Sequence, residues 1–127
     1  MARVKWLLVF LGGGIGSMLR YGLAGAVQAR VDGFPWGTLA VNAAGCLVIG
    51  LLWGAAEVRG VPAGSQLRLL LFAGLLGGFT TFSSFGLETL LLVETGQWPQ
   101  ALAYAGSSLV GGVVLVGVGL VTARALA

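Results

Sequence analysis

The stretch from Gly74 to Phe85 reads GLLGGFTTFSSF and lies inside an apolar run, Leu69 to Leu87, that has no charged residue. An apolar run of this length is typical of a membrane-spanning helix. Gly77 and Gly78, however, are poor helix formers, and the hydroxyl side chains after them compete with the helix for backbone hydrogen bonds. In hydrocarbon, irregular backbone is tolerated only inside protein or beside a water-filled path. The stretch therefore predicts either a helix break whose carbonyl oxygens bind an ion, or a continuous helix that packs closely through small residues.

The composition is that of an integral membrane protein. Of the 127 residues, 57% are hydrophobic and 9% are charged, which no soluble domain of this size matches. Four apolar segments, at about 6–29, 36–56, 69–93 and 99–123, reach the roughly 20 residues that a spanning helix needs. The joints between them are short and contain Gly and Pro. We therefore expect one all-α membrane domain, residues 1–127, multi-pass in the cell inner membrane or plasma membrane.

The reactive side chains give no support to an enzyme or to a metal site of the nitrogen and sulfur type. The chain has one cysteine, Cys46, and no histidine, so zinc, haem and iron–sulfur ligation lack ligands. A thiol nucleophile would lack its usual base for the same reason. The seven basic residues mostly flank the apolar segments, where lipid headgroups explain them without a nucleic-acid partner.

Polar side chains within the expected spans indicate a path for a small anion. Thr38 and Asn42 are four residues apart and share a helix face. Thr81, Ser84 and Glu88 follow the spacing i, i+3, i+7 and share another. Neutral hydrogen-bond donors predominate, which suits a small anion better than a multivalent cation that would need carboxylates. The expected lining consists of Thr38, Asn42, Thr80, Thr81, Ser83, Ser84, Tyr104, Ser107 and Ser108.

Each of the remaining conspicuous residues has two or more interpretations. Arg20 either faces an aqueous vestibule or extends its charge to the interface. Asn42 either lies beside the path or makes an ordinary interhelical hydrogen bond. Phe82 and Phe85 are core or lipid-facing residues, or present their electropositive ring edges to an anion. Glu88 is a proton relay, a hydrogen-bond partner at a pore end, or an interfacial carboxylate.

A bundle of four short helices encloses little space, so a transport role implies an oligomer, most simply a two-fold dimer. The basic residues bear on its topology. With the N-terminus inside, five of them would lie on the cytoplasmic side and one or two on the opposite side, which favours a single orientation. The cytoplasmic group is Arg3, Lys5, Arg59, Arg68 and Arg124; the opposite side has Arg30, with Arg20 as the second if it is counted there.

Three stretches resemble, in order and spacing, the signature sequences of the Fluc (CrcB) fluoride channels. They are GGGIGSMLRY at 12–21, GTLAVNAAG at 37–45 and GGFTTFSSF at 77–85. The resemblance covers essentially the whole chain. Ser17 stands where that family usually has alanine, and Gly112 stands where a hydroxyl residue often continues the polar track.

The resemblance implies an antiparallel, dual-topology homodimer with two fluoride pores, which exports cytoplasmic fluoride passively and so confers fluoride resistance. It implies a third helix broken mid-membrane and a structural Na⁺ at the dimer interface, held by backbone carbonyls of Gly77 and Thr80. The antiparallel assembly conflicts with the single orientation that the count of basic residues favours. A small proton-coupled exporter of the multidrug type is the alternative. The implied pore residues are Phe82, Phe85, Asn42, Thr38, Thr81, Ser84, Ser108, Tyr104 and Glu88, with Arg20 in the vestibule.

Overall fold

A computed structural model describes all residues from Met1 to Ala127, and every regular element in it is helical. Four helical segments are long and apolar enough to cross a membrane, which confirms the predicted all-α membrane architecture. The third of them is composite, with a π-helical part between short α-helical parts. The elements are α1 (Ala2–Gln28), α2 (Trp36–Val58), α3 (Gln66–Arg68), η1 (Leu69–Leu76), α4 (Gly77–Phe79), α5 (Phe82–Glu94) and α6 (Trp98–Ala125).

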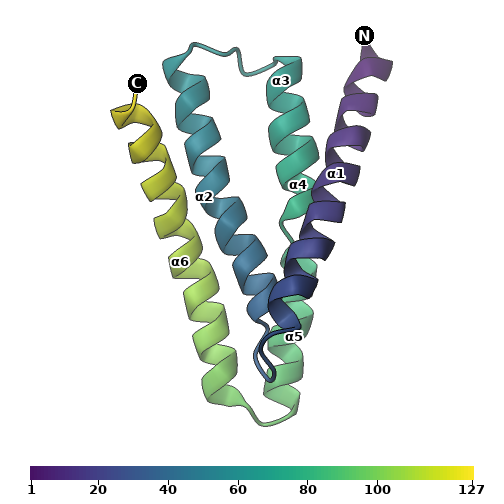
Figure 1. Cartoon of the computed structure of the whole chain (residues 1–127), viewed down its shortest axis with the longest axis vertical. Coiled ribbons are helices and arrows are strands. Elements are labelled where there is room, and N and C mark those ends of the chain that lie inside the picture. The colour runs from purple at the N-terminus through teal and green to yellow at the C-terminus, as the bar shows by residue number, and fades with distance from the viewer.

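The helices form two arms that converge at one end (Figure 1). One arm is the long pair α2 and α6, and the other is α1 with η1 and α4. Both termini and the connection between α2 and α3 lie at the open end, and the other two connections lie where the arms meet. Only 15 of the 127 residues are buried, so most of the apolar surface is left for lipid or for another copy of the chain.

Glycines let the backbones within the second arm touch. A Cβ atom on Gly12 would lie 2.7 Å from the Leu70 carbonyl oxygen, and one on Gly16 would meet the Leu75 carbonyl oxygen. Gly78 faces α1 in the same way, since a Cβ there would meet the carbonyl oxygen of Gly13. Small residues at helix contacts are the usual means of close packing in membranes. Here they bring α1 against η1 and α4.

The connection from α1 to α2 is held by a single side chain. The Gln28 amide nitrogen donates to the carbonyls of Val31 at 2.9 Å and Phe34 at 3.1 Å. Its oxygen accepts from the backbone N–H of Gly37 at 3.1 Å. This satisfies one of the N–H groups that a helix start leaves unpaired, and it fixes where α2 begins relative to α1.

Extended backbone separates α4 from α5. Thr80 has φ −83° and ψ 156°, and Thr81 has φ −145° and ψ 118°. The Thr81 hydroxyl oxygen then accepts from the backbone N–H of Ser84 at 3.3 Å, as an N-cap of α5. The chain thus leaves helical geometry for these residues at the point where glycines and hydroxyl residues follow one another.

Candidate functional site

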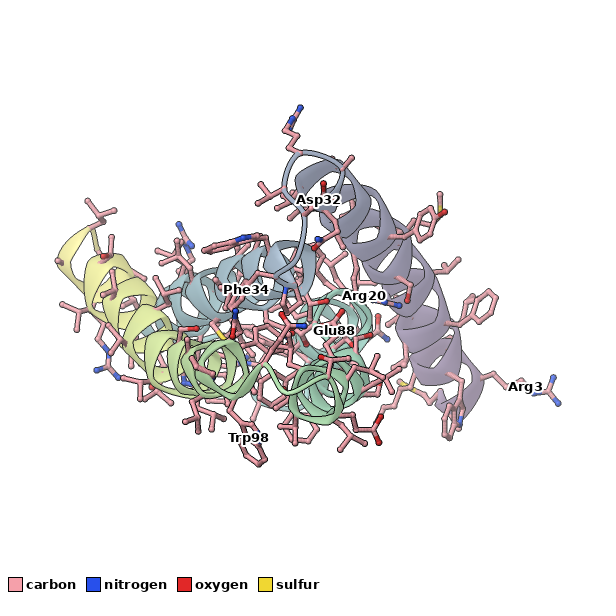
Figure 2. All side chains as sticks on the ribbon, turned by 90° about the horizontal axis from the view of Figure 1, so that it is seen from below. Arg3, Arg20, Asp32, Phe34, Glu88 and Trp98 are labelled. Atoms are coloured by element: carbon pink, nitrogen blue, oxygen red, sulfur yellow. The ribbon has the colours of Figure 1, made fainter.

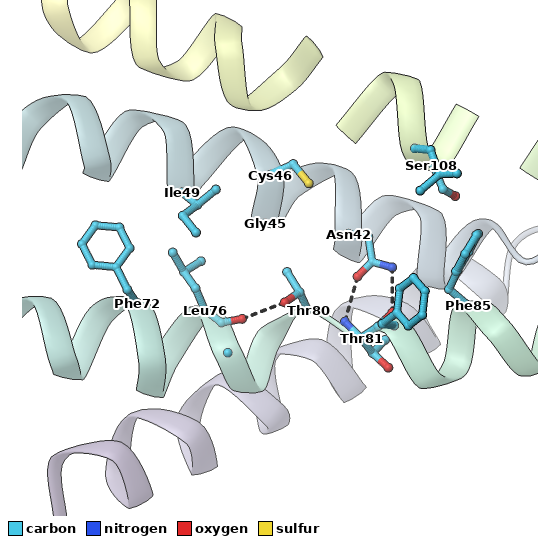
Figure 3. A pocket seen from close by; sticks show the side chains of 13 residues that line it. Asn42, Gly45, Cys46, Ile49, Phe72, Leu76, Thr80, Thr81, Phe85 and Ser108 are labelled. Atoms are coloured by element: carbon cyan, nitrogen blue, oxygen red, sulfur yellow. Dashed lines mark hydrogen bonds between the residues drawn. The ribbon is translucent and has the colours of Figure 1, made fainter. Parts of the chain in front are cut away.

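The side chain of Asn42 on α2 pairs with the extended backbone of Thr81 (Figure 3). The Thr81 N–H donates to the Asn42 side-chain oxygen at 2.9 Å, and the Asn42 side-chain nitrogen donates to the Thr81 carbonyl at 3.0 Å. This amide takes the place of the helical partners that Thr81 lacks. One N–H of the Asn42 amide remains available after these contacts.

The extended backbone at Thr80 and Thr81 changes the hydrogen-bond partners of three carbonyl oxygens. In a continuous helix the Gly77 carbonyl would accept from the Thr81 N–H, but that N–H donates to Asn42 instead. The Thr80 carbonyl accepts no hydrogen bond within the chain. The Gly78 carbonyl accepts from the Arg20 Nε at 3.2 Å, with the Ser17 hydroxyl at 3.5 Å. The carbonyls of Gly77 and Thr80 are therefore free to accept a ligand.

A hollow of about 390 Å³ lies on one side of Thr81, between α2, the composite third segment and α6 (Figure 3). Its polar part combines the free N–H of Asn42 with the hydroxyl of Ser108, which is buried and has no hydrogen-bond partner. A buried polar atom without a partner is rare, so this hydroxyl is a donor available to a ligand. The residues expected to line the pore or bind the ion that meet here are Asn42, Gly77, Thr80, Thr81, Phe82, Phe85 and Ser108.

A second hollow, of about 330 Å³, lies on the other side of Thr81. Arg20 and Glu88 both line it, and Figure 2 shows them near the middle of the molecule, whereas Arg3 lies at its edge. The expected residues that line this hollow are Arg20, Thr38, Thr81, Ser84 and Glu88. Thr81 is common to both hollows.

Glu88 is the acceptor of two hydroxyl groups. The Thr38 Oγ1 donates to one carboxylate oxygen at 2.8 Å, and the Tyr104 hydroxyl donates to the other at 2.6 Å. Tyr104 is fully buried and lines neither of the two hollows. The hydroxyl hydrogens of Thr38 and Tyr104, both expected to serve an anion, are directed to Glu88 in this structure.

The two phenylalanines of α5 differ in their surroundings. Phe85 packs against Tyr104 with ring centroids 5.2 Å apart and against Phe82 at 5.5 Å. Phe82 is 77% exposed. Ser107, also expected in the lining, donates to the Ala103 carbonyl of its own helix at 2.6 Å and borders neither hollow. Ser83 is exposed, with its hydroxyl 3.4 Å from the hydroxyl of Thr81.

Sequence reasoning missed two contacts that shape the site. It identified Asn42 as a donor beside the path but not as the partner of the Thr81 backbone. It placed Arg20 in a vestibule but not against the Gly78 carbonyl. The available signals were an amide and a cation inside apolar segments, where each needs a partner, but nothing in the sequence named those partners.

Known proteins match this chain along nearly its whole length. The family model described as "CrcB-like protein, Camphor Resistance (CrcB)" matches residues 7–120. A protein of Nitratidesulfovibrio vulgaris named "Fluoride-specific ion channel FluC" is 48% identical over 121 residues, covering 94% of this chain and 97% of that protein. A protein of the same name from Thermus thermophilus is 49% identical over 116 residues, covering 91% of each chain.

A third protein with that name, from Methylobacillus flagellatus, is 51% identical over 115 residues and covers 89% of each chain. These matches include all three of the stretches at 12–21, 37–45 and 77–85, since the family model spans them. Together with the four spanning helices, they make this a multi-pass membrane protein. The chain belongs to the CrcB-like family.

Proposed function

We propose that this protein is a passive, fluoride-selective ion channel that releases cytoplasmic fluoride and so protects the cell against it. The observation that carries the proposal is the meeting of the three motif stretches around Thr81: Asn42 pairs with its backbone, and Arg20 holds the Gly78 carbonyl. The relatives named fluoride-specific ion channels support fluoride as the transported ion. Their name describes a channel and not an enzyme.

The available donors fit the needs of fluoride. A channel must replace the hydration shell of its ion with groups of its own. The free N–H of Asn42 and the hydroxyl of Ser108 can donate to an anion in the first hollow. The Ser84 hydroxyl accepts from Thr81 at 3.2 Å and keeps its own hydrogen for the second hollow. In this account the ring edges of Phe82 and Phe85 face the ion between these donors.

The conducting form in this proposal is an antiparallel homodimer with two pores at the subunit interface. One chain alone leaves Phe82, which lines the first hollow, 77% exposed. A second copy packed against this face would cover the phenylalanine and close the hollow. A cysteine introduced at Ala127 in a Cys46→Ser background should react with an impermeant reagent from both sides of the cell membrane in about equal amounts, as expected of a two-fold assembly of inverted subunits.

A structural Na⁺ at the two-fold axis fits the carbonyls beside the extended backbone of Thr80 and Thr81, which in this proposal is the mid-membrane break of the third helix. The carbonyls of Gly77 and Thr80 lack the partners that a continuous helix would give them, and carbonyl oxygen is a ligand that hard cations accept. Each subunit would supply these carbonyls, and the bound ion would place a fixed positive charge near both pores.

Efflux from liposomes tests the function. Liposomes that contain the purified protein and potassium fluoride should release fluoride to an external electrode when a potassium ionophore is added. Protein-free liposomes and chloride-loaded liposomes serve as controls. Retention of fluoride by liposomes with correctly folded protein would reject the channel. Release that requires a pH gradient and disappears in Glu88→Gln would instead support the proton-coupled exporter.

A further inference from the structure

A further cavity of about 330 Å³ is lined by Lys5 on α1, Trp53 on α2, and residues within 63–73 of the α2–α3 connection, α3 and η1. It shares only Phe72 with the first hollow and no residue with the second. Its walls are mainly apolar, and Lys5, Ser65 and Arg68 supply its polar part. The remaining lining is Trp53, Ala63, Gly64, Leu69, Phe72 and Ala73.

The Arg68 guanidinium is held in place at this cavity. Its Nε donates to the Val61 carbonyl at 3.1 Å. Its central carbon lies 4.8 Å from the centroid of the Trp53 ring and 5.9 Å from that of Phe72. The terminal nitrogens carry four further N–H groups, and none of them donates within the chain. A guanidinium fixed in this way is preorganised for a planar, two-point contact with an oxyanion.

No acidic residue lines the cavity. Glu57, the acid at this end of α2, pairs with Arg124 at 2.7 Å and has a weaker charge interaction with Arg68. The hydroxyl oxygen of Ser65 accepts from the backbone N–H of Arg68 at 3.2 Å, so the hydroxyl hydrogen is free to donate. The site thus offers two positive charges and a hydroxyl donor beside apolar walls.

We propose that this cavity binds a phosphate group, supplied by the headgroup of an anionic membrane lipid or by free inorganic phosphate. Arg68 and Lys5 contact the phosphate oxygens, and Ser65 donates a hydrogen bond. The wall of Leu69, Phe72 and Ala73 accepts the first part of a lipid's apolar chain. Because the cavity lies where a spanning helix ends, a headgroup reaches it from the bilayer surface. The inference does not depend on which ion the protein transports.

Calorimetric titration of the purified full-length protein in a non-ionic detergent tests this site. The probes are dioctanoyl phosphatidylglycerol, dioctanoyl phosphatidylcholine and inorganic phosphate. The double variant Lys5→Gln/Arg68→Gln removes both cations of the cavity. The matched control Arg3→Gln/Arg59→Gln removes the same charge from positions at the same end that do not line it.

We expect saturable binding of phosphatidylglycerol that weakens about 25-fold in the cavity variant, at about fivefold for each cation removed, and stays unchanged in the control. Lys5→Gln alone should weaken binding about fivefold, and because Lys5 is exposed this variant keeps the fold. Inorganic phosphate that binds as tightly as the lipid would identify free phosphate as the source. Absence of saturable binding, equal weakening in both double variants, or equal affinity for phosphatidylcholine would overturn the proposal.

Discussion

Replacing Asn42 by aspartate separates the two tasks that this amide performs. The substitution keeps an oxygen to accept from the Thr81 N–H, now 2.9 Å away, but removes the donor that lies 3.0 Å from the Thr81 carbonyl. It also places a negative charge beside the first hollow. Asn42→Ala is the matched variant, since it removes both hydrogen bonds and adds no charge.

The lost hydrogen bonds and the added negative charge have effects of different magnitude. Losing both backbone contacts in Asn42→Ala costs about 2 kcal/mol, at about 1 kcal/mol for each group left without a partner at partial burial. In Asn42→Asp a carboxylate about 5 Å from a passing anion, at an effective dielectric constant of about 20, raises its energy by about 3 kcal/mol. The aspartate variant should therefore conduct about 100-fold less than the wild type.

Fluoride efflux from liposomes measures both variants, and thermal unfolding of the purified protein reports their stability. We expect Asn42→Ala to lose stability and Asn42→Asp to lose flux more than stability. If Asn42→Asp conducts fluoride at the wild-type rate while it remains folded, Asn42 does not lie beside the path and the reasoning is refuted.

Three further substitutions test other parts of the site. Phe85→Ile should lower fluoride efflux by about tenfold or more because it removes an electropositive ring edge. Leu87→Ile, on the exposed face of the same helix, should leave efflux unchanged. Equal efflux rates for the two variants would mean that the Phe85 ring does not contact the ion. Thr80→Ala should retain bound Na⁺ in the purified protein, as measured by atomic emission, because the ligand is the backbone carbonyl; loss of the ion would implicate the hydroxyl. Gly16→Ala should destabilise the protein by about 1 to 3 kcal/mol, because its Cβ would lie 2.9 Å from the Phe79 backbone nitrogen. Gly14→Ala has open space around it and should be neutral or stabilising. Similar unfolding temperatures for the two variants would contradict the close contact between α1 and α4.

The sequence predicts the architecture because apolar length alone identifies a spanning helix, and the four expected segments correspond to helices long enough to cross a membrane. Helical periodicity also predicts some contacts. Thr81, Ser84 and Glu88 do border one hollow, together with Thr38 from the neighbouring helix, because residues three or four apart share a face.

The sequence does not predict how backbone and polar groups are paired across the chain. The π-helix at Leu69–Leu76 lies in a purely apolar run, where side-chain pattern does not reveal the hydrogen-bond register. Asn42 is 39 residues from Thr81 and Arg20 is 58 from Gly78, so their pairing depends on how the helices pack. The same packing directs the hydroxyls of Thr38 and Tyr104 to Glu88.

The reversal potential of the purified protein in a planar bilayer tests the central claim most directly. Fluoride is the only anion on one side of the bilayer, and chloride is the only anion on the other. A fluoride-selective channel should then show a reversal potential far from zero, with the sign set by the fluoride gradient. A reversal potential near zero would mean that fluoride and chloride pass equally well. That result would contradict the proposal that the donors around Thr81 select fluoride.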